Sequence, residues 1–470
     1  MNNYSTLLNP VTTADIAFFQ ELLHERALFG DAIIEDYERD EMTEYGRYKP
    51  DVVLLPLTTD EVSAILKYCS ERRLPVTTRG AGTGLCGGCV PTVGGVLLST
   101  ERMNHVLEID THNAVAVVEA GLLLMDFTKA LEGTGLFYPP DPGEKTATLG
   151  GNAMTNAGGM RAVRFGVTRD YVMGMEVVLP SGEVLMLGGK VAKNSSGYSL
   201  LDLMIGSEGT LAVVTKLWLK LVPEPAVNLS AMALFDDLSA CVEAVPSVLK
   251  SGNPTAVEFM EKEVIDAAER YLGKPFPNPR ANACLLIRLD GPSRAALEPT
   301  LATLTDLLLD LGASDVLLAD TDERKQSIWN ARGAFLEAIS SSTPSMDECD
   351  VVVPRDQVAV FIRESVRVGR ELGVRVRSFG HAGDGNLHIY VCKDNLTDDV
   401  WHVKRQAAMD VLYAAARELG GQVSGEHGVG HAKREYLRES LGDTPIQLMR
   451  GIKAVFDQAG ILNPGKVISK

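Results

Sequence analysis

The chain has 470 residues and a formal net charge of −17, and hydrophobic residues make up 45% of it, as in ordinary globular enzymes. This length predicts two major domains. The acidic balance argues against nucleic acids and anionic membrane surfaces as main partners, because both bind to clusters of Lys and Arg. The first ten residues show no signal-peptide pattern, no 18 apolar residues run uninterrupted, and the seven cysteines are odd in number and scattered, so we expect a cytoplasmic protein with reduced thiols.

The N-terminal part of the chain predicts a helical arm followed by a β-α-β unit. Residues 12–45 are acidic and have a helical period. From Asp51 onward, an apolar run predicts a strand, residues 58–73 predict a helix, and residues 74–79 predict a second strand. This second strand leads directly into a glycine-rich loop.

The loop has the sequence RGAGTG at residues 79–84. Glycines at this density let the backbone approach a ligand and turn several N–H groups inward, which suits a pyrophosphate, although such loops also serve as plain turns. The loop lacks the Gly-Lys-Thr ending of a Walker loop, and no helix follows it as in a dinucleotide-binding fingerprint. For the nearby CxxC pair, Cys86 and Cys89, we expect small-residue packing rather than redox or zinc chemistry.

A second stretch of this kind spans residues 138–159, YPPDPGEKTATLGGNAMTNAGG. Its prolines fix the backbone at the beginning, and the small residues that follow cannot fill a core. Such a stretch usually lines a ligand. The composition then changes at residues 223–225, where we expect a domain boundary. Beyond it, β-like runs alternate with helical patterns, which predicts an antiparallel sheet covered by helices on one face.

Imidazole side chains are crowded in two glycine-rich stretches, GHAGDGNLH at residues 380–388 and GEHGVGHAK at residues 425–433. The turn signal Asp384-Gly385 lies between two β-like runs, so His381 and His388 are expected to flank a hairpin bend and to face the same space. Two imidazoles and the Glu426 carboxylate make a three-ligand set for a divalent metal with open coordination positions. His427 remains as a base. The alternative is that these histidines satisfy backbone groups at turns.

Several motifs occur in an order that resembles a known family. RGAGTG, PPDPG at residues 139–143, TLGGNAMTNAGG at 148–159, GVTRDYV at 166–172 and GSEGTLAVVT at 206–215 resemble the FAD-binding domain of the vanillyl-alcohol oxidase and p-cresol methylhydroxylase superfamily. With GHAGDGNLH, SGEHGVGHAK and ILNPGKV, the resemblance covers nearly the whole chain. The chain resembles the FAD-linked 2-hydroxyacid dehydrogenases, in the branch that holds D-lactate dehydrogenase and the catalytic subunit of glycolate oxidase.

The resemblance implies an α+β fold in three parts: a two-part FAD-binding domain with the N-terminal helical arm (1–226), a cap domain with an antiparallel sheet covered by helices (227–425) and a C-terminal segment that returns to the flavin (426–470). Because no histidine lies between Arg79 and Cys89, we expect FAD without a covalent bond. The implied FAD-binding positions are Arg79, Gly80, Ala81, Gly82, Thr83, Gly84, Pro139, Asp141, Thr146, Gly150, Gly151, Asn156, Gly158, Gly159, Glu208, Gly209, Thr210 and Asn463.

The resemblance also implies a mechanism. A divalent zinc, manganese or iron ion on His381, His388 and Glu426 would hold the substrate, His427 would accept the hydroxyl proton, and flavin N5 would take the hydride. Arg332, in a Trp-x-x-Arg pattern, is expected to bind the substrate carboxylate, although a solvated helix arginine is an equal alternative from spacing alone.

The expected substrate is a short D-2-hydroxy acid, most of all D-lactate. Relatives that use dicarboxylates place a lysine before a strand like CDVVVP, whereas this chain has Glu348 or a neighbour there, an anion that would repel a distal carboxylate. For the electron acceptor, the resemblance favours an electron-transferring flavoprotein. Alternatives are glycolate or D-2-hydroxyglutarate with a quinone, cytochrome or oxygen, a metal-dependent hydrolase, and a catalytically silent flavin scaffold subunit.

Overall fold

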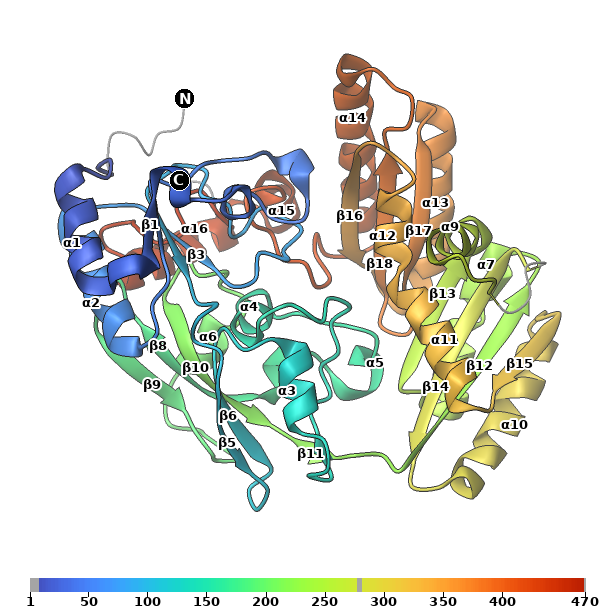
Figure 1. The fold of residues 1–470 in the computed structure, drawn as a ribbon. Helices are drawn as coiled ribbons and strands as arrows, with labels where there is room; N and C mark the ends of the chain where they lie inside the picture. Colours follow the sequence, from blue (N-terminus) through green and yellow to red (C-terminus); the bar gives the residue numbers. More distant parts are fainter. Residues whose placement is uncertain (1–7, 277–280, 469–470) are drawn as a thin grey trace. The chain divides into compact units, whose positions relative to one another are not determined.

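The computed structural model describes residues 8–276 and 281–468, which form two compact units (Figure 1). The first unit contains the chain up to Ala157, then Val167–Glu224 and the part from His427 onward. The second unit contains Gly158–Gly166 and Pro225–Glu426. The short excursion of Gly158–Gly166 has no counterpart in the three parts expected from the sequence. Within the described ranges, no helix combines the length and apolarity needed to cross a lipid bilayer.

The N-terminal arm of the first unit is one α-helix followed by short 3-10 turns. α1 (Thr13–Leu23) begins after Thr12, which forms a capping box with Asp15. The helical period expected for residues 12–45 ends at Leu23, because His24 adopts a left-handed φ of 55°. The turns that follow are His24–Arg26, Gly30–Ala32, Glu35–Glu38 and Thr43–Tyr45.

A four-stranded sheet follows the arm, with the strand order β1-β2-β4-β3. Its strands are β1 (Ala27–Phe29), β2 (Val52–Leu54), β3 (Val76–Arg79) and β4 (Val96–Ser99). α2 (Thr59–Arg72) connects β2 to β3 and buries Val62, Ile65 and Leu66 on one helix face. Both β2 and β3 run parallel to β4, so the expected β-α-β unit is present.

The second sheet of the first unit is antiparallel, with the strand order β5-β6-β10-β8-β9. Its strands are β5 (Val106–Asp110), β6 (Val115–Glu119), β8 (Val172–Val178), β9 (Val184–Gly188) and β10 (Val213–Lys220). β6 is buried along its whole length, whereas the edge strand β9 alternates half-buried and exposed residues. A small two-stranded ladder joins β7 (Leu136–Phe137) and β11 (Val222–Pro223).

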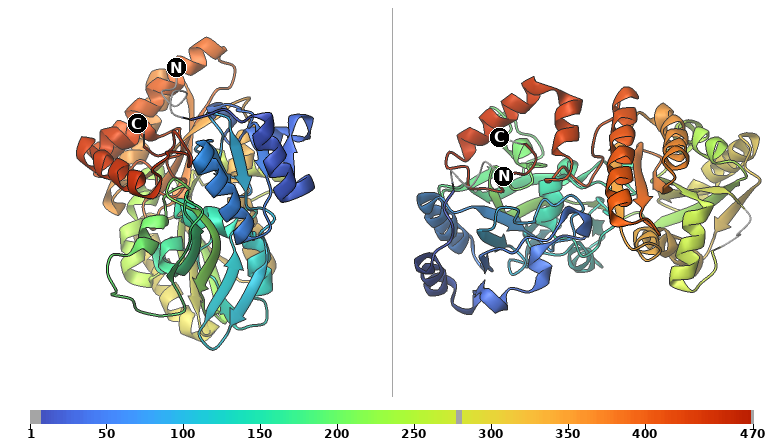
Figure 2. Two further views of the ribbon diagram at one scale, coloured as in Figure 1. Left: turned by 90° about the vertical axis from the view of Figure 1, so that its left-hand side faces the viewer. Right: turned by 90° about the horizontal axis from the view of Figure 1, so that it is seen from above.

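Short helices and the C-terminal segment complete the first unit. They are α3 (Leu124–Ala130), α4 (Leu149–Thr155), α6 (Leu200–Met204), α15 (Arg434–Leu441), α16 (Asp443–Phe456) and the 3-10 turn Thr168–Tyr171. After α16, drawn in red in both views of Figure 2, the chain returns to β3. There Leu462 pairs in parallel with Val76, and Asn463 N donates a 2.7 Å hydrogen bond to Val76 O.

The second unit is built on a seven-stranded sheet in the order β15-β12-β14-β13-β17-β18-β16. All neighbouring strands in it are antiparallel, as the sequence predicted for the cap domain. The strands are β12 (Val227–Phe235), β13 (Ala256–Glu261), β14 (Ala283–Gly291), β15 (Asp315–Ala319), β16 (Met346–Val352), β17 (Arg375–His381) and β18 (Asn386–Cys392).

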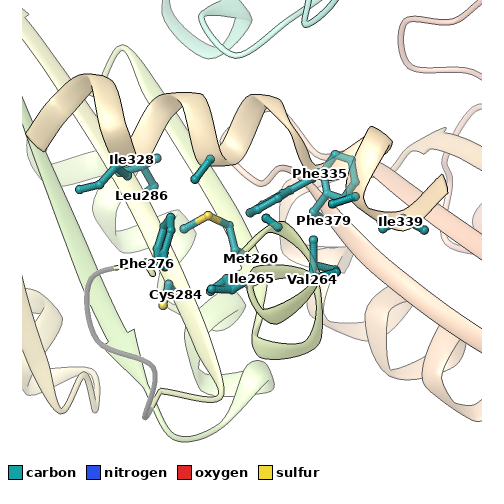
Figure 3. Packing of buried hydrophobic residues seen from close by; sticks show 14 of the residues in the cluster. Met260, Val264, Ile265, Phe276, Cys284, Leu286, Ile328, Phe335, Ile339 and Phe379 are labelled. Carbon is teal, nitrogen blue, oxygen red and sulfur yellow. The ribbon is translucent and has the colours of Figure 1, made fainter. Parts of the chain in front are cut away.

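Helices cover both faces of this sheet, not one face as expected. They are α5 (Ala162–Phe165), α7 (Leu238–Glu243), α8 (Val245–Gly252), α9 (Lys262–Leu272), α10 (Arg294–Asp310), α11 (Asp322–Gly333), α12 (Phe335–Ser340), α13 (Val358–Leu372), α14 (Asp398–Glu418) and the 3-10 turn Arg355–Gln357. Helices α9, α11 and α12 pack on the face that carries Met260 and Phe379 (Figure 3). Leu304 of α10 lies beside Ile287, which faces the other way. The sequence analysis did not identify α9, α11 and α12 as a helical layer. For α11 the reason is that most of its residues are polar.

Candidate active site

Four adjacent strands of the second unit carry polar side chains on one sheet face. Antiparallel pairing places Met260 opposite Phe379, Phe379 opposite His388, and His388 opposite Asp350. Because side chains alternate along a strand, positions two residues away share this face. They are Glu258 on β13, His381 on β17, Tyr390 on β18 and Glu348 on β16. Sheet register alone therefore gathers two imidazoles and three carboxylates.

The hairpin predicted at Asp384-Gly385 joins β17 to β18. Gly385 has φ +88°, and a Cβ at this position would lie 2.2 Å from Val353 O, so only glycine fits the turn. His381 ends β17 and His388 is the third residue of β18. The turn thus places both histidines on the same face.

The structure brings together the three residues predicted as metal ligands. Glu426 Oε1 lies 3.4 Å from His381 Nε2 and 3.3 Å from His388 Nε2. The three possible ligand atoms all lie within 4.8 Å of one another, and both imidazoles are buried. Three ligands from two strands and one loop, with Nε2 atoms converging on a carboxylate oxygen, fit a divalent ion with open positions. His427, the predicted base, follows Glu426 directly in the chain and is partly buried.

The other nitrogen of each imidazole faces a buried carboxylate. His381 Nδ1 lies 2.8 and 2.9 Å from the two oxygens of Glu258, and His388 Nδ1 lies 3.2 Å from Glu348 Oε1. A carboxylate at Nδ1 favours the tautomer with the proton on Nδ1, which leaves the Nε2 lone pair for a metal. Burial alone would lower the pKa of His381, but Glu258 and Glu426 raise it well above its usual value.

A further carboxylate, Asp350, holds the loop that carries Glu426. Its Oδ2 accepts hydrogen bonds from Ser424 Oγ at 2.8 Å, Gly425 N at 3.2 Å and Glu426 N at 3.3 Å. Its Oδ1 accepts one from Asn386 Nδ2 at 2.7 Å. Three of these four donors belong to Ser424, Gly425 and Glu426, so Asp350 on β16 holds the backbone that leads into the third predicted ligand.

The charge balance of the cluster also favours a cation. Glu258, Glu348 and Asp350 are almost inaccessible to solvent, and the Glu426 side chain is 11% exposed. Glu258 in this group pairs with the buried guanidinium of Arg332. Buried carboxylates are costly unless positive charge compensates them. A divalent ion on the predicted ligands would add such charge.

Arg332, predicted to bind the substrate carboxylate, lies on α11 and is buried. Its Nε donates to Glu258 Oε2 at 2.8 Å and its Nη2 lies 2.6 Å from the same oxygen. The guanidinium stacks 4.6 Å above the centroid of Phe379. A solvated helix arginine, the alternative left open by the sequence, is excluded. Glu258, which the sequence analysis missed, is therefore shared by the arginine and by His381.

Two predicted FAD positions, Gly158 and Gly159, belong to the second unit. A Cβ at Gly158 would lie 2.9 Å from Glu426 Oε2, so this glycine packs directly against the predicted ligand. The segment also carries Arg164, whose Nη1 donates to Asp290 O at 3.1 Å and to Thr255 Oγ1 at 3.2 Å. The structure therefore gives Gly158 a second neighbour that the family motif did not indicate.

In the first unit, three predicted FAD stretches meet one another. A Cβ at Gly80 would lie 2.2 Å from Thr148 Oγ1, and a Cβ at Gly209 would lie 2.2 Å from Thr78 Oγ1. The loop at 79–84, the helix start at Thr148 and the turn at 206–210 are thus in close contact. Buried polar atoms here lack hydrogen-bond partners among the described residues, namely Asn152 Nδ2, Thr77 Oγ1 and Asn463 Oδ1. Such atoms fit a polar ligand such as FAD.

The Arg79 side chain holds the N-terminal arm. Its Nη1 donates to Arg39 O and its Nη2 to Asp36 O, both at 2.7 Å. Asp40 in the same arm accepts a 2.6 Å hydrogen bond from Gly87 N, and burial raises the pKa of Asp40 to about 7. The charged group of Arg79 is thus used inside the protein, which leaves the backbone of the loop to approach a ligand.

The C-terminal segment is fastened to the same region. Glu208 accepts hydrogen bonds from Val429 N and Gly430 N, both at 2.7 Å. Asn463 Nδ2 donates to Gly88 O at 2.9 Å and to Glu208 O at 2.7 Å. The predicted positions Glu208 and Asn463 therefore connect the loops to one another.

The remaining predicted FAD positions lie in the first unit, where several side chains have local partners. Asp141 pairs with Lys145, and Thr146 Oγ1 donates to Glu144 Oε1 at 2.6 Å. Thr210 Oγ1 donates to Ser207 O at 2.7 Å. The other positions of this set are Ala81, Gly82, Thr83, Gly84, Pro139, Gly150, Gly151 and Asn156. Neither Cys86 nor Cys89 forms a disulfide bond with another described residue.

Known structures define the class of protein to which this fold belongs. The chain is similar to p-cresol methylhydroxylase, with a TM-score of 0.82 and 20% identity, over 98% of this chain and 99% of that one. It is also similar to 4-ethylphenol oxidase from Gulosibacter chungangensis, with a TM-score of 0.81 and 21% identity, over 98% of both chains. At these identities the likeness establishes the fold, which confirms the fold class expected from the motifs.

Sequence comparisons narrow the class. Residues 50–198 match the model of an FAD binding domain, and residues 224–467 match that of the FAD linked oxidases, C-terminal domain. The chain is 48% identical to D-lactate dehydrogenase of Anaerostipes hadrus over 98% of both sequences. It is 39% identical to glycolate oxidase subunit GlcD of Bacillus subtilis (strain 168) over 92% of both. The chain belongs to the FAD-linked oxidase family.

We predict that Gly80→Ala lowers the FAD content several-fold, because the added Cβ would meet Thr148 Oγ1 at 2.2 Å and displace the loop from the start of α4. FAD is measured in the supernatant after acid precipitation, per mole of chain. The control is Gly143→Ala, a position with open space around it, which should retain full FAD. Flavin colour left in the wild-type pellet would contradict non-covalent binding, and unchanged FAD in Gly80→Ala would contradict the role of this contact.

Proposed function

We propose that the protein is an FAD- and divalent-metal-dependent dehydrogenase that oxidises a short D-2-hydroxy acid, D-lactate to pyruvate above others. The observation that carries this proposal is the convergence of His381 Nε2 and His388 Nε2 on Glu426 Oε1 in a chain of the FAD-linked oxidase family. Relatives named D-lactate dehydrogenase in Anaerostipes hadrus and Archaeoglobus fulgidus, at 48% and 40% identity, support the substrate class. A metal-dependent hydrolase would have no use for an FAD binding domain.

The cofactors would supply the redox and Lewis-acid chemistry. Bound FAD provides a hydride acceptor, and a divalent ion on the three ligands lowers the pKa of a hydroxyl that it binds. The glycine-rich stretches of the first unit would hold FAD by their backbone, because their charged side chains already have protein partners. We assign the FAD contacts to the predicted positions in the first unit, without a covalent bond.

The chain's own residues orient the substrate and move the proton. Arg332 presents a planar cation suited to a carboxylate, and two of its five N–H donors already point to Glu258. His427 accepts the hydroxyl proton in this proposal, since it follows the ligand Glu426 in the chain and is not itself needed to bind the ion. Loss of that proton would let the carbon that bears the hydroxyl give up a hydride, which bound FAD would accept.

Metal dependence predicts that chelation, His381→Ala or His388→Ala abolishes flavin reduction by D-lactate, because removing one of three ligands weakens the site severely. FAD should remain bound, since the ligands lie in the second unit and most of the FAD binding domain lies in the first. Anaerobic stopped-flow spectroscopy and metal analysis measure both quantities. His402→Ala, which removes an exposed imidazole of α14, is the matched control. Full reduction by metal-free protein would exclude the metal role.

Glu348 carries the prediction on substrate size. It lies buried on β16, accepts a 2.6 Å hydrogen bond from Tyr390 OH and lies 3.2 Å from His388 Nδ1. Its negative charge therefore belongs to the cluster that would receive the substrate, as the sequence analysis inferred from the missing lysine. A lysine at this position would place a cation beside His388 and disturb the ligand itself, so a neutral replacement is the better test. Glu348→Gln removes the charge and keeps an acceptor for Tyr390.

We expect Glu348→Gln to raise the kcat/KM ratio of D-2-hydroxyglutarate to D-lactate by roughly tenfold, because a like charge near a bound carboxylate costs at least about 1.4 kcal/mol. The wild type should prefer D-lactate. Tyr390→Phe removes the hydrogen bond between Tyr390 and Glu348 but keeps the charge of Glu348. This variant should leave the kcat/KM ratio unaltered. A wild type that is reduced faster by D-2-hydroxyglutarate than by D-lactate would refute this reading of Glu348. Faster reduction by glycolate would identify the alternative monocarboxylate.

For the electron acceptor we propose an electron-transferring flavoprotein, on the resemblance of residues 79–110 to family members that use one. The expected result is that the D-lactate-reduced protein, kept anaerobic, is reoxidised by purified electron-transferring flavoprotein much faster than by dissolved oxygen or a soluble quinone. The comparison is made by following flavin absorbance at equal acceptor concentrations. Equal or faster reoxidation by oxygen would identify an oxidase instead.

A further inference from the structure

We propose that Glu258 is a positioning residue that fixes His381 and Arg332 relative to each other, and that it thereby sets both metal affinity and binding of the substrate carboxylate. The inference rests on the proposed function, because it uses the roles given there to the imidazole and the guanidinium. Nothing in the family motifs points to Glu258, which lies in the unremarkable run AVEFME.

The contacts of Glu258 connect two elements that the sheet alone does not connect. Its carboxylate is fully buried, with one oxygen 2.8 Å and the other 2.9 Å from His381 Nδ1 on β17. The same Oε2 accepts from Arg332 Nε at 2.8 Å and lies 2.6 Å from Nη2. One carboxylate on β13 therefore joins a strand and a helix through charge-assisted hydrogen bonds, which are shorter and stronger than neutral ones.

For His381, this contact settles which nitrogen faces the ion. Both carboxylate oxygens lie on the Nδ1 side, and an ionised carboxylate can only accept a hydrogen bond. The proton of a neutral imidazole is thereby held on Nδ1, and the lone pair on Nε2 points toward Glu426 Oε1, 3.4 Å away. A metal requires that lone pair, so Glu258 preorganises the ligand.

For Arg332, the contact settles which edge is left for an anion. Nε and Nη2 form one edge of the fork and are directed at Glu258, and the plane lies over Phe379. Nη1 remains for a carboxylate, in an orientation fixed by the plane of the guanidinium. Because the same carboxylate holds His381, the remaining donors of Arg332 and the Nε2 of His381 keep a constant separation.

The position of Glu258 follows from sheet register. Met260 pairs with Phe379, so antiparallel pairing places Glu258 beside His381 two residues further along. Val257 and Phe259 point to the opposite face and are buried. A carboxylate buried in this mostly apolar strand is tolerated because donors from two residues compensate it, and the loss of its charge therefore affects both partners.

Glu258→Gln tests the inference, because an amide of the same shape can accept from one partner but presents N–H groups to the other. The FAD-bound protein is stripped of metal and titrated with Zn²⁺ against a chromophoric chelator. The expected result is a 10- to 100-fold weaker Zn²⁺ affinity, together with a several-fold higher KM for D-lactate at saturating Zn²⁺. Glu258→Asp, which keeps the charge at a shorter reach, should recover part of both losses.

Glu261→Gln on the same strand is the matched control. Glu261 is also a buried carboxylate, but it accepts from Ser378 N at 2.8 Å, and within the described part of the chain no hydrogen bond or ion pair joins it to the predicted ligands or to Arg332. Burial raises the pKa of Glu261 to about 7, so a neutral amide is a mild change there. The control should bind Zn²⁺ and D-lactate as the wild type does, with the same FAD content.

The outcomes separate this inference from the function on which it rests. A wild-type protein that binds no Zn²⁺ overturns both. A wild type that binds Zn²⁺ while Glu258→Gln binds it equally well overturns the inference alone. If Glu258→Gln and Glu261→Gln weaken Zn²⁺ binding to the same extent, Glu258 has only a general structural role and the inference is also wrong.

Discussion

The antiparallel register of β13, β17, β18 and β16 is the constraint on which the polar cluster of the second unit depends. A shift of one strand by a single residue would turn its polar side chains to the opposite face. The register is fixed at one end by the tight turn at Gly385, where no side chain fits. Along the strands it is fixed by Met260 and Phe379, which face the apolar cluster beneath α9 and α12 (Figure 3). On this sheet face, apolar side chains that pack against the helices lie beside the polar side chains of the cluster.

This proximity makes the burial of the carboxylates costly in free energy, so each of them needs compensating partners. Carboxylates beside an apolar core lose hydration, and burial alone would raise the pKa of Glu258, whereas His381 and Arg332 lower it below its usual value. Asp350 is compensated by four hydrogen-bond donors from the chain. Glu426 Oε1 lies 3.4 Å from His381 Nε2 and 3.3 Å from His388 Nε2, and this convergence of three groups suits a cation.

Much of this could be predicted from the sequence, for physical reasons that are specific to each element. The hairpin followed from Asp384-Gly385 between two β-like runs, and the two histidines followed from their spacing around it. Glu258 lies 123 residues before His381, and only strand order makes them neighbours. Its signal was a carboxylate in a mostly apolar strand that also carries Glu261, and this pattern does not name a partner. Which N–H groups Asp350 would hold is likewise undecided until the sheet is assembled.

In the glycine-rich loops, the sequence predicted a role for each segment but not the contacts of its individual side chains. Their composition indicated a close approach of backbone to ligand, but the use of individual side chains depended on distant segments. Arg79 was expected at the cofactor, yet its guanidinium holds Asp36 O and Arg39 O of the arm. Gly158 was assigned to FAD by motif, yet it packs against Glu426 in the second unit. Motifs thus indicated segments, whereas the contacts of individual side chains depend on how those segments meet.

The stretch SGEHGVG shows how the chain holds a catalytic candidate from both sides. Within the second unit, Asp350 binds the backbone N–H groups of Gly425 and Glu426. Within the first unit, Glu208 binds those of Val429 and Gly430. His427 lies in the chain between these two pairs of residues. Gly428, with φ +82°, gives the backbone the left-handed turn that separates them. Carboxylates that bind backbone N–H groups on both sides of the Glu426-His427 pair fix its place in the chain, which suits a ligand that is followed at once by a base.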